Sequence, residues 1–256
     1  MSLSGGARGG GKAMRRILVA AALAAVGLMP MPATGQTAPT CFDKTVTILG
    51  TEGSDDLRGT EGSDVMHGLG GGDQMMGTGV SEARDGRDWM CGGDGDDIMR
   101  GEAGHDFMDG GLNTDNLRGG PGNDKLFGGP GPDYLADERW GADHVNGGLD
   151  NDELTNFDDQ LQHPNGDTFL GGHGNDVVLM VRRQPLVRGQ AWGKDVIRGG
   201  TGDDELWGTW TPFLGSEHKH EAPGNEDTVD GGSGIDTCYV NLDDTVVNCE
   251  HVIVVG

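Results

Sequence analysis

The sequence has few aromatic, proline and basic residues, and each shortage excludes a class of protein. Aromatic residues are 5% and hydrophobic residues 34% of the 256 residues, so a chain with 50 glycines is expected to be disordered or built from repeats. The 10 prolines are too few for collagen. Asp and Glu outnumber Lys and Arg by 42 to 18, for a formal net charge of -24. Because such a field repels polyanions and attracts cations, we expect metal ions, and no nucleic acid, as partners.

Long hydrophobic runs are also missing, except for one near the N-terminus. Residues 17–29 form an uncharged apolar run that follows four basic residues and precedes the small residues Ala33, Thr34 and Gly35. The run is too short to cross a bilayer, and we predict a signal peptide at residues 1–35 that is removed before Gln36. The chain is then expected to be secreted, without a stable membrane span, in a compartment that permits disulfides. A retained membrane anchor is the alternative.

What the chain has in abundance is a nine-residue repeat with glycine first and aspartate sixth. The clearest copies are residues 101–109 (GEAGHDFMD), 119–127 (GGPGNDKLF) and 128–136 (GGPGPDYLA). Alignment on the aspartate gives seventeen units between Gly50 and Tyr239. Their sixth-position residues are Asp55, Asp64, Asp73, Asp88, Asp97, Asp106, Asp115, Asp124, Asp133, Asp143, Asp152, Asp167, Asp176, Asp195, Asp204, Asp227 and Asp236.

The eighth position tests this alignment independently, because every unit has a residue there that can be buried. These residues are Leu57, Met66, Met75, Met90, Met99, Met108, Leu117, Leu126, Leu135, Val145, Leu154, Phe169, Val178, Ile197, Leu206, Val229 and Cys238. The fourth position is always Gly, Asn or Asp, the residues that best tolerate positive φ. We therefore predict turns at positions one to six and a short strand at positions seven to nine, with only the eighth side chain pointing inward.

One apolar residue in nine makes a small core, which stabilises a unit by less than the ordering of nine residues costs. Aspartates stacked about 5 Å apart would also repel one another. Calcium is a hard cation that takes six or more oxygen ligands from carboxylates and carbonyls, so it would remove the repulsion and supply the missing stabilisation. The sequence thus predicts multiple Ca²⁺ ions, with all seventeen aspartates as candidate ligands.

The pattern G-G-x-G-x-D-x-U-x resembles the RTX, or haemolysin-type calcium-binding, repeat family. The resemblance implies an all-β protein, a parallel β-roll (β-solenoid) of about seventeen nonapeptide half-turns in which two units make one coil. It also implies calcium held between turns n and n+2 by the sixth-position aspartates and neighbouring carbonyls, which allows up to fifteen sites here. We expect an N-terminal cap at residues 36–49, the roll at 50–239 and a C-terminal cap at 240–256. The chain resembles small secreted members that are nearly all repeat, so no toxin or protease activity is expected.

Five insertions interrupt the repeat, and all of them precede even-numbered units. They are expected at residues 78–83, at Asp137, and at residues 156–161, 180–189 and 208–221. If two units make a coil, all five insertions emerge on one edge of the roll. Binding groups are often placed on loops of a rigid scaffold, so we expect any recognition of a partner on this edge.

Several side chains in or near the insertions leave alternatives open. His218, His220 and Glu221 have a spacing that could bind a transition metal, although a solvated loop is favoured. An aromatic group could stack on sugar rings or cover the loops, and a basic group could bind an acidic glycan or pair with nearby carboxylates. The aromatic group is Trp192, Trp207, Trp210 and Phe213, and the basic group is Arg182, Arg183 and Arg188.

The chain shows no motif for nucleophilic catalysis such as G-x-S-x-G. We therefore expect a calcium-stabilised extracellular binding or structural module and not an enzyme, with cell-surface or extracellular polysaccharide as a candidate partner. The alternative is a small secreted enzyme or glycan-binding protein that uses the insertions.

The four cysteines allow three pairings. Cys238 and Cys249 bracket a segment that can turn back at Asp243 and Asp244, so we predict a disulfide between them. Cys41 is then left to pair with Cys91. Free buried thiols are the alternative, which export makes less favourable.

Overall fold

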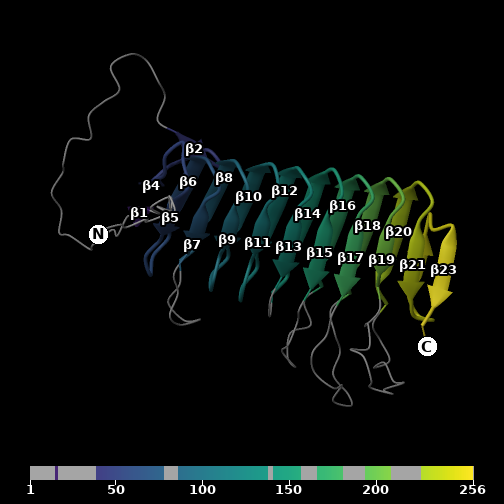
Figure 1. Ribbon diagram of the computed structural model, residues 1–256. Coiled ribbons are helices and arrows are strands. Elements are labelled where there is room, and N and C mark those ends of the chain that lie inside the picture. Colours follow the sequence, from purple (N-terminus) through teal and green to yellow (C-terminus); the bar gives the residue numbers. More distant parts are fainter. Residues whose placement is uncertain are drawn as a thin grey trace, which may run out of the picture.

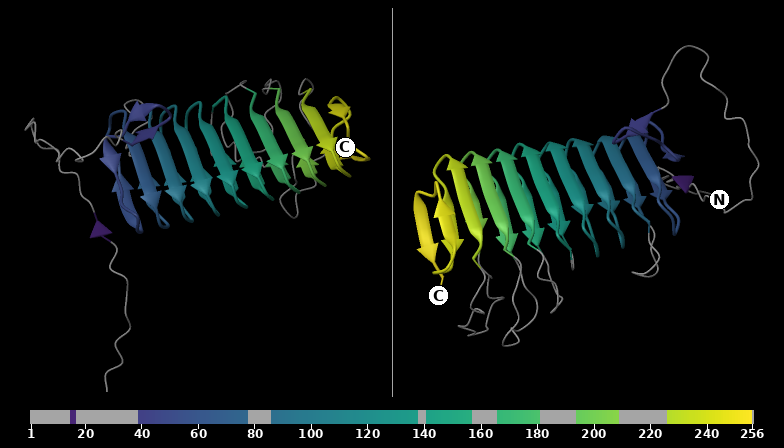
Figure 2. Two further views of the ribbon diagram at one scale, coloured as in Figure 1. Left: turned by 90° about the horizontal axis from the view of Figure 1, so that it is seen from above. Right: turned by 180° about the vertical axis from the view of Figure 1, so that it is seen from behind.

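The computed structural model describes residues 15–16, 39–77, 86–137, 141–156, 166–180, 194–208 and 226–255. These residues form strands and turns and contain no helix. Apart from one small hairpin, the strands belong to two parallel sheets that run side by side along the molecule (Figures 1 and 2). Within the described ranges, no helix has the length and apolar character that a membrane crossing requires.

The eleven-stranded sheet, which we call the odd sheet, contains the odd-numbered strands other than that of the hairpin. Its strands are β1 (Arg15–Arg16), β5 (Asp55–Arg58), β7 (Gln74–Met76), β9 (Ile98–Arg100), β11 (Asn116–Arg118), β13 (Tyr134–Asp137), β15 (Glu153–Asn156), β17 (Val177–Met180), β19 (Glu205–Trp207), β21 (Thr237–Val240) and β23 (His251–Val254).

The ten-stranded sheet, which we call the even sheet, contains the even-numbered strands other than that of the hairpin. Its strands are β4 (Ile48–Leu49), β6 (Val65–Gly70), β8 (Trp89–Asp94), β10 (Phe107–Leu112), β12 (Lys125–Pro130), β14 (His144–Leu149), β16 (Thr168–His173), β18 (Val196–Thr201), β20 (Thr228–Ser233) and β22 (Thr245–Val247). The antiparallel hairpin is β2 (Thr40–Cys41) and β3 (Lys44–Thr45).

From β4 to β23 the chain alternates between the two sheets, and each strand pairs in parallel with the strand one coil further along. The register places the same repeat position side by side, as where Leu117 lies between Met99 and Leu135. Each of the seventeen repeat aspartates begins or directly precedes one of the strands β5 to β21. The prediction of an all-β protein with a parallel β-roll is confirmed.

The core is a single file of side chains between the sheets. All seventeen residues predicted to point inward are buried, and Met75, at 2% exposed, is the most accessible of them. The prediction of three-residue strands was too short for the even sheet, where most strands continue through the first three positions of the next unit. This extension depends on glycine, as at Gly111, whose φ is 112° and where a Cβ would contact the carbonyl oxygen of Gly93.

The turns divide into two sets, one on each edge of the roll. We call the turns that lead into the odd sheet the odd edge, and those that lead into the even sheet the even edge. Apart from the gap at residues 17–38, every gap between the described ranges falls after β7, β13, β15, β17 or β19 and before the next strand of the even sheet. Both attachment points of every insertion therefore lie on the even edge, as the numbering of the repeats predicted.

Three residues expected to begin insertions belong to strands instead. Asp137, Asn156 and Met180 are the last residues of β13, β15 and β17, where they pair in register and are buried. Several side chains from the insertions lie outside the described residues. They are His218, His220 and Glu221, for which a solvated loop was favoured over a metal site, the basic group Arg182, Arg183 and Arg188, and the aromatic group except Trp207. Trp207 stacks on Tyr239 with ring centroids 3.7 Å apart.

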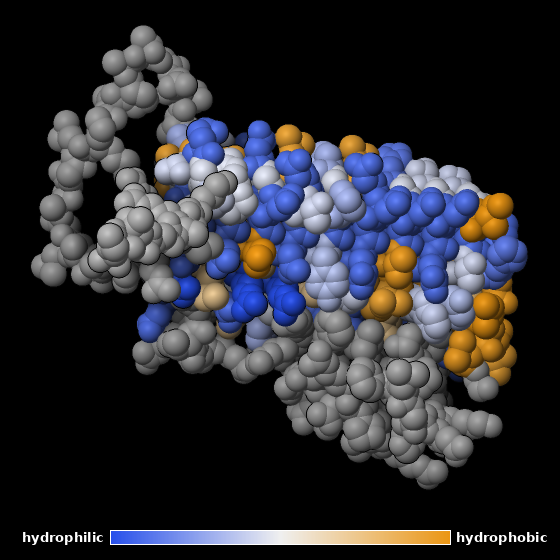
Figure 3. All heavy atoms as spheres, in the orientation of Figure 1, coloured by the Kyte–Doolittle hydropathy of each residue, from blue (hydrophilic) through white to orange (hydrophobic). Residues whose placement is uncertain are grey.

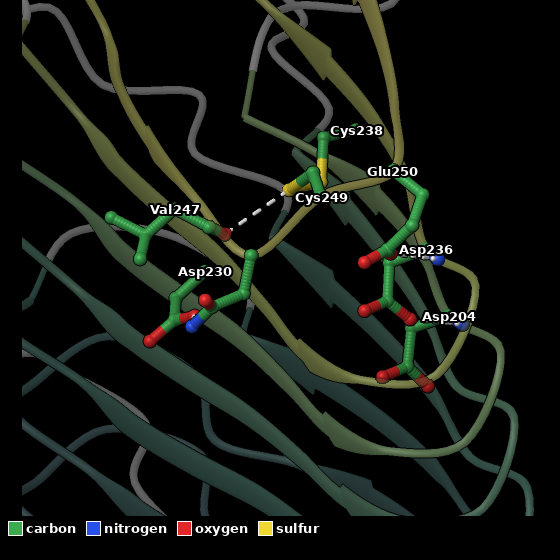
Figure 4. The surroundings of a disulfide bond; sticks show 8 residues. Asp204, Asp230, Asp236, Cys238, Val247, Cys249 and Glu250 are labelled. Atoms are coloured by element: carbon green, nitrogen blue, oxygen red, sulfur yellow. Dashed lines mark hydrogen bonds between the residues drawn. A yellow bond between two sulfur atoms is a disulfide. The ribbon is translucent and has the colours of Figure 1, made fainter.

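Both predicted disulfides are confirmed. Cys41 in the small hairpin bonds to Cys91 of β8, and Phe42 beside it packs against Phe107 with ring centroids 5.9 Å apart. Cys238 of β21 bonds to Cys249 at the C-terminal end (Figure 4). These bonds tie each terminal segment to the neighbouring coils.

Both ends of the roll carry strands outside the seventeen repeat units. At the C-terminal end, β22 and β23 extend both sheets by one further strand each, and apolar side chains such as Val252 and Ile253 are exposed there (Figure 3). Within the predicted signal peptide, only Arg15 and Arg16 are described, and their backbone forms β1 beside β5. The domain boundaries stay predictions.

Candidate metal centre

The repeat aspartates form two buried columns, one on each edge of the roll. Nine of them lie on the odd edge, from Asp55 to Asp236, and eight on the even edge, from Asp64 to Asp227. None is more than 7% exposed. The aspartate therefore ends each turn inside the molecule, directly before the strand that carries the inward apolar side chain.

One oxygen of each carboxylate joins consecutive coils. Asp115 Oδ1 accepts a hydrogen bond from the backbone N–H of Asp97 at 2.8 Å, and Asp133 Oδ1 accepts the equivalent bond from Asp115. All fifteen pairs related by n and n+2 have this bond. The sequence predicted the pairing of units but not this bond, which satisfies a buried backbone donor that would otherwise be costly.

The other oxygen is buried without a hydrogen-bond partner along most of the odd edge. This holds for the Oδ2 atoms of Asp73, Asp97, Asp115, Asp133, Asp152, Asp176, Asp204 and Asp236, within the part of the chain that the structure describes. The adjacent space exists because the first repeat position is glycine. A Cβ at Gly128 would contact both Asp133 Oδ2 and the carbonyl oxygen of Gly147. The space is thus lined by carboxylate and carbonyl oxygens, the donor set that suits Ca²⁺.

The carboxyl groups of these columns are held in an unfavourable electrostatic environment. Burial raises the pKa of Asp97 to about 7 and the pKa values of Asp115 and Asp152 to about 8. The hydrogen bond from the preceding backbone lowers each pKa, and the charges of neighbouring aspartates raise it further. The columns therefore require positive charge, from protons or a metal ion, at neutral pH.

The ends of the columns use different residues. At the N-terminal end, Thr51 donates to Asp55 Oδ2 from both its backbone N–H and its hydroxyl, at 2.6 and 2.8 Å, and Thr60 does the same for Asp64. At the C-terminal end, Glu250 takes the place of a repeat aspartate and accepts the N–H of Asp236 at 3.0 Å (Figure 4).

The other column ends in the same way, because Asp244 Oδ1 accepts the N–H of Asp227 at 3.2 Å. Sequence reasoning missed Asp244 and Glu250 because neither follows a glycine-rich turn. Their acidic character, one coil beyond the last two repeat aspartates, was the available signal.

One cluster of carboxylates on the even edge includes an aspartate that is not at the sixth repeat position. One carboxylate oxygen from each of Asp124, Asp137 and Asp143 lies within 4.8 Å of the others, and all three residues are buried. Sequence reasoning placed Asp137 in an insertion and so missed it as a candidate ligand.

The sequence matches the family model for the RTX calcium-binding nonapeptide repeat (4 copies) over more than half of its length. The matched residues are 49–79, 82–117, 109–136, 139–154, 191–210 and 224–238. The chain belongs to this family. Its repeats imply several bound Ca²⁺ ions and a calcium-binding structural protein. Such repeats are typical of secreted, non-enzymatic proteins, and the two disulfides fit an extracellular setting. No curated protein matches the sequence.

The raised pKa values predict how pH acts on this RTX protein when calcium is removed. Because the pKa values of Asp97, Asp115 and Asp152 in the roll exceed the usual 3.8, protonation favours the roll over the unfolded chain. This stabilisation is fully present below about pH 4 and is lost as pH rises through about 7 to 8. We expect the far-UV circular dichroism of the EDTA-treated protein to show more strand structure at pH 5.5 than at pH 8.5.

The control for this experiment is the calcium-saturated protein, which should not gain strand structure on the same acidification. A second control adds salt at pH 8.5, since screening alone acts weakly on buried charges. Equal spectra of the EDTA-treated protein at the two pH values would contradict the assignment of the repulsion to buried carboxylates.

Proposed function

We propose that this RTX protein is exported, folds when it binds calcium outside the cell, and serves there as a structural or binding module. The observation that supports it best is the column of buried Oδ2 atoms on the odd edge, each beside a space that glycine keeps open. A buried carboxylate without a partner is strongly unfavourable. A regular column of them requires an equally regular supply of cations.

The residues that would hold an ion between two coils are the paired aspartates and the carbonyl oxygens of the glycine turns. For one coil these are Asp97 and Asp115 together with carbonyls from the turns around Gly92 and Gly110. Calcium supplies positive charge there and links one coil to the next. Since each coil contacts only its neighbours, folding should spread along the roll as the sites fill.

The test is a calcium titration of the full chain, followed by far-UV circular dichroism, with two matched variants. Asp115→Asn removes one buried carboxylate charge but keeps an oxygen that can accept the N–H of Asp97. Asp94→Asn removes the same charge from an exposed residue three positions before the buried Asp97. We expect Asp115→Asn to cost about 1–3 kcal/mol of calcium-dependent stability, as is usual when a buried charged partner is lost.

The control variant Asp94→Asn should leave the calcium midpoint almost unchanged. If the wild-type spectrum were the same in calcium and in EDTA at pH 8.5, calcium-driven folding would be wrong. If both variants shifted the midpoint equally, the effect would reflect net charge and not the buried column.

The even edge supports a second candidate function, the binding of cell-surface or extracellular polysaccharide. Its support is the placement of the insertions, all of which attach to this edge while the odd edge continues without interruption. A rigid scaffold that presents several segments on one side is a common design for binding sites.

Deletion of residues 181–189 and of residues 209–221 tests this candidate, because both deletions spare the buried Met180 and the strand-flanking Gly208. We expect calcium-induced folding to persist and binding to a purified acidic cell-wall polysaccharide to be lost. If the wild-type protein binds no such polysaccharide, or if both deletions leave binding unchanged, the candidate should be dropped.

A further inference from the structure

The residue that ends or directly follows an odd-sheet strand on the even edge differs along the roll. It is glycine in the coils that contain Gly101 and Gly119, which follow β9 and β11 directly. In the next three coils it is Asp137, Asn156 and Met180, which pair with one another in register. Glycine leaves the space beside the repeat aspartate open, since a Cβ at Gly119 would contact Asp124 Oδ2 at 2.6 Å. The three replacements place a side chain at this position.

Asp137 places a third carboxylate there. Its side chain is 0% exposed, and neither of its carboxylate oxygens has a hydrogen-bond partner in the described residues. It lies with Asp124 and Asp143 in the cluster whose three oxygens are within 4.8 Å of one another. Asp124 Oδ2 is also buried without a hydrogen-bond partner in the described part of the chain. Buried carboxyl groups this close together are stable only when protons or a metal cation neutralise their charge.

Asn156 shows the alternative arrangement one coil further along. Its Nδ2 donates a hydrogen bond of 2.8 Å to Asp167 Oδ2, and both residues are buried. The amide therefore satisfies the repeat carboxylate with a neutral donor from the protein itself. Asn156 and Asp137 occupy the same position of the strand ladder in neighbouring coils and differ only in having an amide or a carboxylate. The two coils therefore show what each group does beside a repeat aspartate.

We propose that Asp137, a residue outside the repeat, is a metal ligand that forms a three-carboxylate site for a Ca²⁺ ion with Asp124 and Asp143. The proposal rests on the calcium-binding function proposed above and adds that the sites of the roll are unequal. An additional carboxylate ligand raises the affinity of an oxygen site for calcium. The ion at this site should therefore be the last to leave as calcium is removed, and would hold together the coils that contain β12 to β14.

The test measures bound calcium in the full chain after equilibrium dialysis against a series of EGTA-buffered free calcium concentrations. The wild-type protein should keep about one ion per chain at free concentrations at least about tenfold below those that empty the remaining sites. Asp137→Asn should lose this ion and keep the others, because its amide can donate to Asp143 as Asn156 donates to Asp167. Circular dichroism at saturating calcium shows whether the variant folds.

Asn156→Asp is the reciprocal variant and should gain one tightly held ion beside Asp143 and Asp167. Asp94→Asn controls for the change in net charge and should keep the wild-type series. The proposal is overturned if Asp137→Asn retains the tight ion. It is also overturned if all calcium sites of the wild-type protein have the same affinity, which is the result expected if Asp137 is protonated and bonded to Asp143. Failure of calcium binding at all sites would overturn the proposed function as well, whereas an unchanged tight class overturns only this inference.

Discussion

The structure depends on burying one carboxylate in every half-turn. Each aspartate must lie inside, because its Oδ1 accepts the backbone N–H that closes the turn of the preceding coil. The same burial removes the charge from water and places it in line with like charges. The hydrogen bond that joins the coils thus requires a burial that makes the carboxylates repel one another. A bound cation removes this repulsion while the hydrogen bonds remain. The glycines follow from this constraint, since a side chain beside the carboxylate would fill the space that a cation needs.

The two edges of the roll meet this constraint in different ways. The odd edge is uniform, with glycine beside every buried aspartate that lacks a second partner. The even edge combines the attachment points of all insertions with replacements for glycine at Asp137, Asn156 and Met180. An edge that uses an amide or an apolar group in place of a cation depends less on calcium there.

Much of the fold could be predicted from the sequence because the same pattern of turn and strand residues occurs in seventeen units. Position eight alone located the core, and both disulfides followed from the positions of four cysteines. The assignment of the aspartates as calcium ligands stays a prediction. The features that could not be predicted lie at the insertions, where the nine-residue spacing is interrupted. Asp137 read as an inserted residue because a linear alignment cannot tell the last residue of a strand from the first of a loop, whereas the ladder pairs it with Asn156.

Hydrogen exchange at the backbone N–H groups of the repeat aspartates tests the central claim most directly, because each of these groups is held by the carboxylate of the next coil. At pH 8.5, above the raised pKa values of Asp97 and Asp115, the amides of these two residues should be strongly protected when calcium is bound, since their acceptors are fixed and buried. With EDTA in excess at the same pH, they should exchange at the rate of an unstructured chain. Protection that survives the removal of calcium would contradict the account, because it would mean that the buried carboxylates need no cation.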